Sequence, residues 1–550
     1  MFLLHVILIN LWILNINLII IINLSFLKIN ISYPIILDWI SSGFLSWVLL
    51  ISSVVFIYRK SYIGNTSLNK RFIILVILFI ISIALLIISP SLIGIIIGWD
   101  GLGITSFLLV IFYQNNRRLK SGIVTIYINR FGDVIIIFSI IIIIPIFTDI
   151  NKLVKNFYFI IIAILTLAAI TKRAQIPFSA WLPIAIAAPT PVSSLVHSST
   201  LVTAGVYLLL RFYFLIKNIF IRNILITISL ITRVTAGVIA CVESDFKKVI
   251  AISTLRQLGL IVFILALNEI KISFFHIISH ALFKALLFLS CGIIIIISLS
   301  IQDRRFKSNI KSKSYFIPII FLLSRLRLRG FPFLTGFFSK DLIIERVLNF
   351  NNFIITYSLL VISCILTSIY RFRLFYICIK INRSNEKIYQ ILENKTFYII
   401  IILYTWSIIL GKFIFNLIIF SIISIIINII KIISLFILTA GILISRFKIW
   451  LKSKFIINII REIIFLNFFS SKYFSDSKIF IKNSLDLKWL ELIGPSGLFL
   501  LRTNTNKKII FLNKNLNLKF LLLIFVYIYI MIFIFSLSVE RSIEDTKVIK

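Results

Sequence analysis

Acidic residues, cysteine and methionine are all scarce in this chain. Of its 550 residues, 19 are Asp or Glu, against 57 Lys and Arg, and there are 4 cysteines and 2 methionines. The cysteines form no Cys-x-x-Cys pair and lie in or next to apolar segments, so neither a disulfide framework nor a zinc or iron–sulfur site follows. Glycine-rich nucleotide-binding fingerprints are also missing. Any redox chemistry linked to this chain must therefore take place on another polypeptide.

Apolar residues are abundant instead. Hydrophobic residues make up 60% of the chain, and its mean hydropathy is +1.11. A soluble domain could not carry that composition, because too little polar surface would face the water. Apolar runs recur along the whole chain, and each is long enough to cross about 30 Å of hydrocarbon as a helix. The sequence therefore predicts an all-α, polytopic membrane protein.

We expect about fifteen membrane helices, each set by one apolar run. They lie near 2–27, 36–58, 72–90, 91–113, 122–147, 157–189, 192–216, 219–241, 247–267, 272–299, 314–350, 353–379, 397–418, 424–446 and 519–537. The first run has no basic region before it and no small-residue cleavage site, so it is expected to be a membrane helix rather than a signal peptide.

The order of these runs predicts five regions. They are N-terminal membrane helices (1–71), a core (72–379), further membrane helices (380–446), a polar and amphipathic segment (447–518), and a final membrane helix with a charged tail (519–550). The amphipathic part is expected to form a helix along the membrane surface or against neighbouring subunits. The basic blocks between apolar runs are typical of anchoring to anionic lipid headgroups, and nothing supports nucleic-acid binding.

Two of the runs are interrupted. The run 157–189 contains "TKRAQIPFSAWLPIAIAAPTP", and the run 314–350 contains "RGFPFLTGFFSKD". Proline removes a backbone donor and breaks a helix. Non-helical backbone at membrane depth is tolerated only where it is buried or lines a wet cavity. A pair of interrupted segments in two halves of a chain is typical of transporters built from inverted repeats.

Ionisable residues occur within the apolar runs, where a charge costs about 3 kcal/mol. Asp100 lies in "GWDG", near the middle of its run. Asp133 follows Arg130 by three residues, so the two could simply neutralise each other on one helix face. Lys172 ends a run just before the first break, where it could either extend to the membrane surface or face a cavity.

Three more residues share one helix face. His276, His280 and Lys284 recur every four residues and are hard to explain as packing. His197 is surrounded by small polar residues and could be a hydrogen-bonded structural histidine. Lys340 and Asp341 stand at the second break. Because all these groups can gain or lose a proton, a chain of them across the membrane plane is what a proton relay requires.

Seven motifs occur in order and carry a family resemblance. They are "GWDGLGITSFLLV", "NRFGDV", "AQIPFSAWLP", "AAPTPVSSLVHSSTLVTAGVYLLLR", "DFKKVIAISTLRQLGL", "HALFKALLF" and "GFPFLTGFFSKD". Over roughly residues 35–380 the chain resembles the proton-pumping membrane subunits of respiratory complex I, a family similar to the large subunits of multi-subunit Na+/H+ antiporters. Its long C-terminal extension resembles that of the longest pump subunit, in which a lateral helix clamps the neighbouring pumps.

The resemblance implies roles for the ionisable residues. Asp100 matches the acid that pairs with Lys172, His197 the relay histidine, and Lys284 the central lysine. Lys340 and Asp341 match the charged pair at the second break, with Asp133, His276 and His280 as secondary candidates.

The resemblance also implies a function. It is proton translocation coupled to NADH:ubiquinone electron transfer in the mitochondrial inner membrane. The implied partners are subunits 2 and 4 and their neighbours, with anionic lipid such as cardiolipin. No cofactor or metal is expected on this chain, because NAD, FMN, iron–sulfur clusters and ubiquinone belong to partner subunits. The alternatives are a stand-alone or Mrp-type Na+/H+ antiporter subunit and a structural spacer, which would not explain the buried lysines.

Several arginines stand where a membrane segment would not be expected to hold them. Three of them alternate in "SRLRLRGFPF" and so cannot share one aqueous face. These are Arg325, Arg327 and Arg329; Arg173, Arg256 and Arg371 occupy positions where family members commonly have small residues. Many invertebrate mitochondria read AGA as serine and AUA as methionine. We therefore expect that several of these arginines are serines in the native protein and many isoleucines are methionines, so that the net charge of +38 is overstated.

Overall fold

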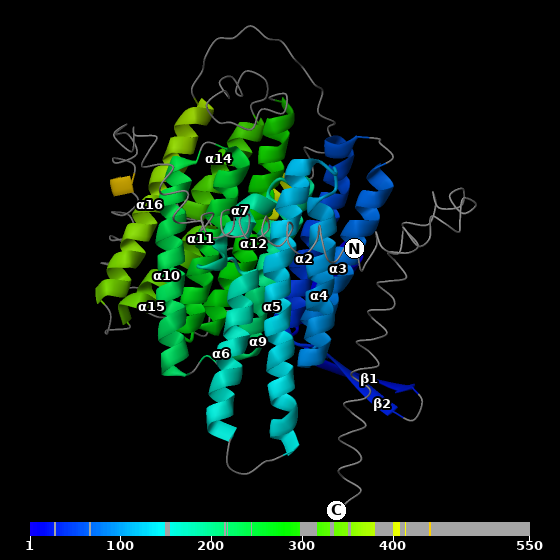
Figure 1. Ribbon diagram of the computed structural model, residues 1–550. Coiled ribbons are helices and arrows are strands. Elements are labelled where there is room, and N and C mark those ends of the chain that lie inside the picture. The colour runs from blue at the N-terminus through cyan, green and yellow to red at the C-terminus, as the bar shows by residue number, and fades with distance from the viewer. Residues whose placement is uncertain are drawn as a thin grey trace, which may run out of the picture. The chain divides into compact units, whose positions relative to one another are not determined.

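A computed structural model describes most of the first 380 residues. The described ranges are 1–26, 29–64, 68–148, 154–213, 218–243, 245–297, 316–329, 335–349, 354–379 and 400–407, with a few single positions besides. The chain divides into two compact units, Met1–Ile22 with Tyr33–Phe465 and Asn23–Ser32 with Leu466–Lys550. All the helices described below lie in the first unit, which is a bundle of long helices (Figure 1).

The first half of the bundle is a run of long helices. They are α1 (Phe2–Ile13), α2 (Trp39–Ile63), α3 (Leu68–Ile88), α4 (Leu92–Val110), α5 (Asn116–Thr148) and α6 (Val154–Lys172). After them come short pieces: the 3-10 turn η1 (Phe178–Ala180), α7 (Trp181–Ala185), α8 (Thr190–Val192), the π-helical η2 (Ser193–Thr200) and α9 (Leu201–Arg211). The remaining helices are α10 (Ile219–Val242), α11 (Phe246–Ala266), α12 (Ile270–Ile297), α14 (Phe316–Arg329), α15 (Thr335–Asn349) and α16 (Ile354–Ile379).

Seven stretches of the described residues are long and apolar enough to cross a membrane. They are Trp39–Ile63, Leu68–Ile88, Arg118–Ile142, Thr190–Arg211, Ile219–Val242, Phe246–Ala266 and Ile270–Ile296. The apolar windows of α11 and α12 are wholly buried, whereas that of α5 is 33% buried. The polar groups within those two windows therefore lie inside the protein, and α5 lies at its edge.

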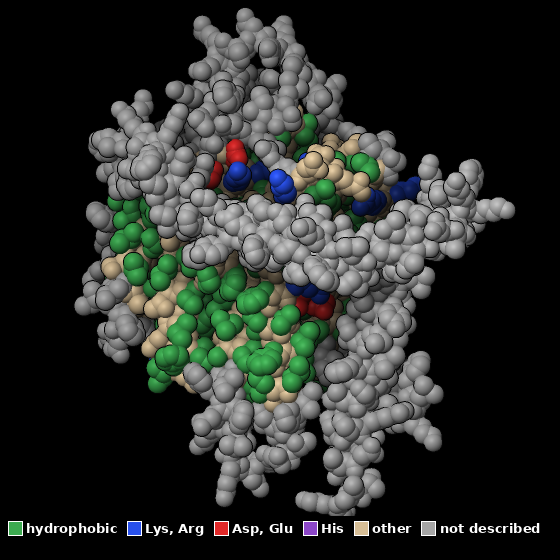
Figure 2. All heavy atoms as spheres, viewed as in Figure 1, with side chains coloured by type: hydrophobic (Ala, Val, Ile, Leu, Met, Phe, Trp, Pro, Cys, Tyr) green, Lys and Arg blue, Asp and Glu red, His purple; other side chains and the backbone are tan. Residues whose placement is uncertain are grey.

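The outer surface of the bundle is strongly apolar. Figure 2 shows hydrophobic side chains over much of the described surface on the viewed face. On α5 the exposed large side chains recur every three or four residues, which places them along one stripe: Tyr127, Phe131, Val134, Phe138 and Ile141. A stripe of this kind faces either lipid or a neighbouring membrane subunit.

The prediction of one membrane helix over 2–27 is wrong. Helix α1 ends at Ile13, and Asn15 has a left-handed backbone with φ of 56°. The chain then forms strand β1 (Leu18–Phe26), which pairs with β2 (Ile29–Leu37) in a two-stranded sheet. Asparagine tolerates the left-handed conformation, and the isoleucines that follow have stiff, β-branched side chains that favour strands. The all-α prediction therefore fails at this hairpin, while the rest of the described chain is helical.

The first predicted break is confirmed. Helix α6 ends at Lys172, Ala174 takes a φ of 55°, and only the short pieces η1 and α7 lie between this end and Thr190. At the second, α14 ends at Arg329 and α15 begins at Thr335, while 330–334 lie outside the described residues. The predicted segments at 424–446, 447–518 and 519–550 lie outside them as well, apart from a few single positions.

One polar clamp joins three helix ends. Asp38 caps α2 and accepts two hydrogen bonds from Arg211, at the end of α9, at 2.6 and 2.9 Å. Arg211 Nε also donates to the hydroxyl of Tyr207 at 2.6 Å, and that hydroxyl donates to the carbonyl of Ile87 in α3 at 2.5 Å. Burial raises the pKa of Asp38, but the hydrogen bonds from Arg211 and Ser41 outweigh it and hold the pKa below its ordinary value.

This clamp predicts a pH-dependent effect of Arg211→Met. Because folding lowers the pKa of Asp38, its stabilisation is present above the ordinary value of about 4 and is lost as the pH falls through the folded value. We expect the variant to lose about 2 kcal/mol of stability at pH 7 and less at pH 3. Thermal unfolding of the purified protein at both pH values measures this. Arg222→Met, which removes an arginine without an ion-pair partner among the described residues, is the control; equal losses at pH 7 and pH 3 would contradict the clamp.

Candidate functional site

Four charged residues from three helices form one cluster, which we call the entry cluster. They are Asp100 on α4, Arg130 and Asp133 on α5, and Lys172 at the end of α6. Arg130 Nη1 lies 3.2 Å from Asp133 Oδ2 and 3.7 Å from Asp100 Oδ2, so one guanidinium bridges two carboxylates. Two cations and two anions make the cluster formally neutral, which lowers the cost of placing it in a membrane.

The hydrogen-bond partner of the Lys172 ammonium group is Trp99, and not the predicted partner Asp100. The ammonium donates to the carbonyl of Trp99 at 2.7 Å and lies 3.7 Å from the centre of the Trp99 ring. It also interacts electrostatically with Asp133 and Asp100. The structure thus brings Asp100 and Lys172 into one cluster, while the ion pair that Asp100 makes within 4 Å among the described residues is with Arg130.

Burial differs sharply within the entry cluster. Lys172 is fully buried and the Asp133 side chain is 4% exposed, whereas the side chains of Asp100 and Arg130 are 25% and 46% exposed. The cluster therefore has an inner end at Lys172 and an outer end at Arg130. The predicted Arg130–Asp133 pair is confirmed, but the contact of Arg130 with Asp100 on another helix could not be found by counting along one helix.

His197 lies in the π-helical element η2. It is buried, and its ring centroid is 6.4 Å from that of Trp181 in a tilted arrangement. The serines and threonines around it use their hydroxyls on carbonyls of their own helix, as Ser199 does with Leu195 at 2.9 Å. π-Helical turns are rare in proteins, and a large share of those that do occur lie at functional sites. His197 therefore lies on an element that packs against α12, the helix of His276 and His280.

The predicted face of α12 is polar and fully buried. His276, His280 and Lys284 are each at most 1% exposed. Lys284 donates to the hydroxyl of Ser253 at 2.6 Å and to the carbonyl of Ile250 at 3.2 Å, both on α11. For His280, neither ring nitrogen has a hydrogen-bond partner among the described residues. The α12 face is therefore a row of titratable groups at one-turn spacing, which we call the central row.

The second break brings Lys340 to the central row. Lys340 lies on α15, is 9% exposed and interacts electrostatically with His276. The preceding residue, Ser339, has its hydroxyl 3.1 Å from His276 Nδ1. The side chain of Asp341 lies outside the described residues.

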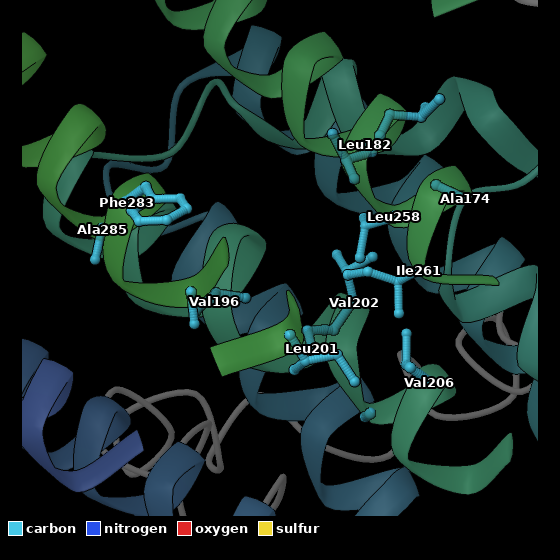
Figure 3. Packing of buried hydrophobic residues seen from close by; sticks show 14 of the residues in the cluster. Ala174, Leu182, Val196, Leu201, Val202, Val206, Leu258, Ile261, Phe283 and Ala285 are labelled. Atoms are coloured by element: carbon cyan, nitrogen blue, oxygen red, sulfur yellow. The ribbon is translucent and has the colours of Figure 1, made fainter. Parts of the chain in front are cut away.

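Close-packed hydrocarbon surrounds these polar groups. Figure 3 shows the apolar side chains of α7, α9, α11 and α12 packed together, among them Leu182, Val202, Leu258 and Phe283. In such a low-dielectric interior, a proton moves between hydrogen-bonding groups or ordered waters and not through bulk solvent. Within the described ranges no group of three or more His, Cys, Asp or Glu side chains gathers as metal ligands would.

The surroundings of the buried arginines bear on the expectation that some of them are serines in the native protein. Arg173 is fully buried, and none of its three guanidinium nitrogens has a hydrogen-bond partner among the described residues. Arg327 is 1% exposed and donates to the carbonyl of Tyr404 at 3.3 Å and to the hydroxyl of Ser407. A buried unpaired charge costs several kcal/mol, whereas a serine hydroxyl can bond to its own helix. The side chains of Arg329 and Arg371 lie outside the described residues.

We therefore predict serine at position 173 of the native protein. Peptide mass spectrometry of the protein isolated from its native membranes would read the residue mass directly. The matched control is Arg211. Because its charge is paired with Asp38, we expect the same measurement to find arginine at position 211. Arginine observed at both positions would contradict the prediction and leave the Arg173 charge without compensation.

Comparisons with known proteins agree on one family. Residues 89–367 match the family model described as "NADH:quinone oxidoreductase/Mrp antiporter, TM". A protein of Mytilus edulis named NADH-ubiquinone oxidoreductase chain 5 is 39% identical over 500 residues, or 85% of each chain. The chain 5 proteins of Aedes aegypti and Locusta migratoria are each 40% identical over 62% of this chain, and these matches span 60% and 61% of the relatives' own length.

Solved structures show the same fold. The Mrp complex from Dietzia sp. aligns with a TM-score of 0.70 at 21% identity, over 91% of this chain and 58% of that one. An archaeal respiratory membrane complex, the membrane-bound sulfane sulfur reductase, aligns with a TM-score of 0.65 at 18% identity, over 80% of this chain and 93% of that one. The chain therefore belongs to the NADH:quinone oxidoreductase/Mrp antiporter transmembrane family, and within it to the group named NADH-ubiquinone oxidoreductase chain 5.

Proposed function

We propose that this chain is a proton-translocating core subunit of mitochondrial respiratory complex I. The observation that carries the proposal is the central row, in which Lys284 lies fully buried in a helix whose apolar span is itself buried. A lysine that only extended to the membrane surface would not be placed there. Membership of the chain 5 group supports the same reading.

The contacts of Lys284 suit a group that changes its protonation state. Ser253 Oγ and the Ile250 carbonyl accept hydrogen bonds from the ammonium form. When the lysine loses its proton, the serine hydroxyl can rotate and donate to the free amine, because a hydroxyl is both donor and acceptor. The site thus accommodates both states without moving the backbone, as a relay group requires.

The entry cluster is proposed as the other switch. Asp100 and Asp133 share the positive field of Arg130 and Lys172, so a change in one ion pair alters the charge balance of the rest. In this proposal protons pass between the entry cluster and the central row by way of His197, and Lys340 with Asp341 forms the terminal step. His276 and His280 serve within the central row.

Further proposals concern the rest of the chain and its surroundings. We propose a complete chain of about fifteen membrane helices in the five regions predicted above, with a lateral helix within 447–518 that binds sister subunits. The proposed location is the mitochondrial inner membrane, next to subunits 2 and 4 and to anionic lipid such as cardiolipin. This chain holds no cofactor in the proposal; NAD, FMN, iron–sulfur clusters and ubiquinone are held by partner subunits.

Purification tests the assembly. The protein, captured from mild-detergent extracts of its own mitochondrial membranes, is expected to bring down a large assembly with flavin and iron–sulfur absorbance and with NADH-oxidising activity. Capture of the chain in a colourless assembly without those absorbances would contradict the proposal and favour an antiporter subunit.

A further inference from the structure

Three helices meet at the ring of His276. On one side, Nε2 lies 3.3 Å from the amide oxygen of Gln257 on α11. On the other, Nδ1 lies 3.1 Å from the hydroxyl of Ser339 on α15. Each of the three side chains is buried, with at most 2% exposed. The imidazole of α12 thus contacts a side chain of α11 and a side chain of α15 at the same point.

The hydrogen-bond partners of His276 determine which of its ring nitrogens carries the hydrogen. A neutral imidazole has one N–H donor and one acceptor nitrogen. Because the amide oxygen of Gln257 can only accept, the ring hydrogen lies on Nε2. Nδ1 then carries the lone pair and accepts the hydroxyl hydrogen of Ser339. The pair of neighbours therefore selects one tautomer of His276 out of two.

The selected tautomer fixes which ring nitrogen can take up a proton and which can release one. An arriving proton can bind only at the lone pair of Nδ1, on the α15 side where Lys340 follows Ser339. Binding makes an imidazolium with two N–H donors, and the Ser339 hydroxyl must then turn its hydrogen away and accept from Nδ1. The proton on Nε2 is then the one that the ring can release, once its hydrogen bond to the Gln257 oxygen is broken, and the acceptor in this proposal is His280, one turn along α12.

We propose that Ser339 is a positioning residue that couples the second broken helix to the central row by holding Nδ1 of His276 toward α15. The proposal rests on the proposed function, because it assigns a step within the same proton path. Ser339 keeps its own hydrogen throughout. Only the direction of its O–H bond changes, away from Nδ1 when the ring is charged and toward Nδ1 when the ring is neutral. Any movement of α15 that withdraws Ser339 would release the tautomer and interrupt transfer between Lys340 and His276.

The next group in the row fits this direction. His280 follows His276 by one turn and, with both ring nitrogens lacking a partner among the described residues, can take up a proton or a bridging water without breaking an existing bond. Lys284 lies one turn further and bonds to Ser253. His276, His280 and Lys284 therefore follow one another at one-turn spacing along α12.

The test compares Ser339→Ala with Ser339→Thr in the assembled complex. The measured quantity is protons moved per NADH oxidised in sealed membrane vesicles. We expect alanine to lower this ratio by about tenfold, the change that corresponds to losing one hydrogen bond of about 1.4 kcal/mol. Threonine keeps the hydroxyl and is expected to restore most of it. Ser290→Ala, which removes a buried hydroxyl that bonds to its own helix, is the matched control with no change expected.

The outcomes separate this inference from the proposed function. An unchanged ratio in Ser339→Ala, or a threonine variant as defective as alanine, overturns the positioning role while leaving the proton path in place. Should Ser339→Ala fail to assemble, Ser339→Cys, which keeps the volume and weakens the donor, is measured with the same expectation. Lys284→Met is run in parallel: if it pumps normally, the proposed proton path through the central row is wrong.

Discussion

Replacing Lys284 by methionine is expected to lower proton translocation by about 100-fold, the lower end of what a positioned proton donor contributes. Methionine has nearly the volume of the lysine stem and no titratable group. The buried contacts of α12 should therefore persist, and the Ser253 hydroxyl keeps the hydrogen bond that it donates to the Ile250 carbonyl at 2.5 Å. Vesicle acidification driven by NADH measures the translocation.

The control removes a lysine that the account leaves outside the path. Lys248 is half exposed and pairs with Asp245 at 3.0 Å near the start of α11. Lys248→Met is expected to pump normally. Oxidation of NADH with an artificial electron acceptor should be unchanged in both variants, because we propose that partner subunits carry out that chemistry. A Lys284→Met complex that pumps at the unmodified rate would place the central step elsewhere.

Asp100→Asn is expected to have the second largest effect, a loss of about tenfold in coupled turnover with assembly largely intact. The amide keeps the size of the carboxylate but cannot take up or release a proton. Arg130 retains its 3.2 Å contact with Asp133, so the cluster stays held together while its charge becomes more positive by one. The same vesicle assay measures the loss, with quinone-linked NADH oxidation recorded alongside.

An exposed carboxylate provides the comparison for Asp100→Asn. Asp245 lies before α11 and has a side chain that is 31% exposed, close to the 25% of Asp100, but its partner Lys248 belongs to the same helix end. Asp245→Asn is expected to leave turnover unchanged. Normal pumping by Asp100→Asn would remove that residue from the mechanism and leave Asp133 with Lys172 as the switch.

Helices and breaks could be predicted because their causes are local. A long apolar run predicts a membrane helix by its length, and "AQIPFSAWLP" predicts a break because Pro177 lacks an amide hydrogen. The face shared by His276, His280 and Lys284 follows from the four-residue spacing alone. Each of these signals is complete within one stretch of the chain, so no knowledge of neighbouring helices was needed.

The errors and omissions have a different origin. The hairpin after Ile13 was missed because hydropathy alone does not separate a strand from a membrane helix; the left-handed Asn15 and the β-branched isoleucines carry the weaker signal that decides it. Arg130 reaches Asp100 on another helix, and Ser339 meets His276 from a third. A one-dimensional pattern says which face a residue occupies but not which helix packs against that face.

NADH-driven proton movement by the intact assembly tests the central claim most directly. The complex, purified through this chain and placed in liposomes with quinone, is titrated with NADH while a pH-sensitive dye reports the lumen. We expect acidification that requires NADH, does not require sodium and is lost in Lys284→Met. Proton movement that depends on a sodium gradient and proceeds without NADH, or that survives Lys284→Met, would contradict it.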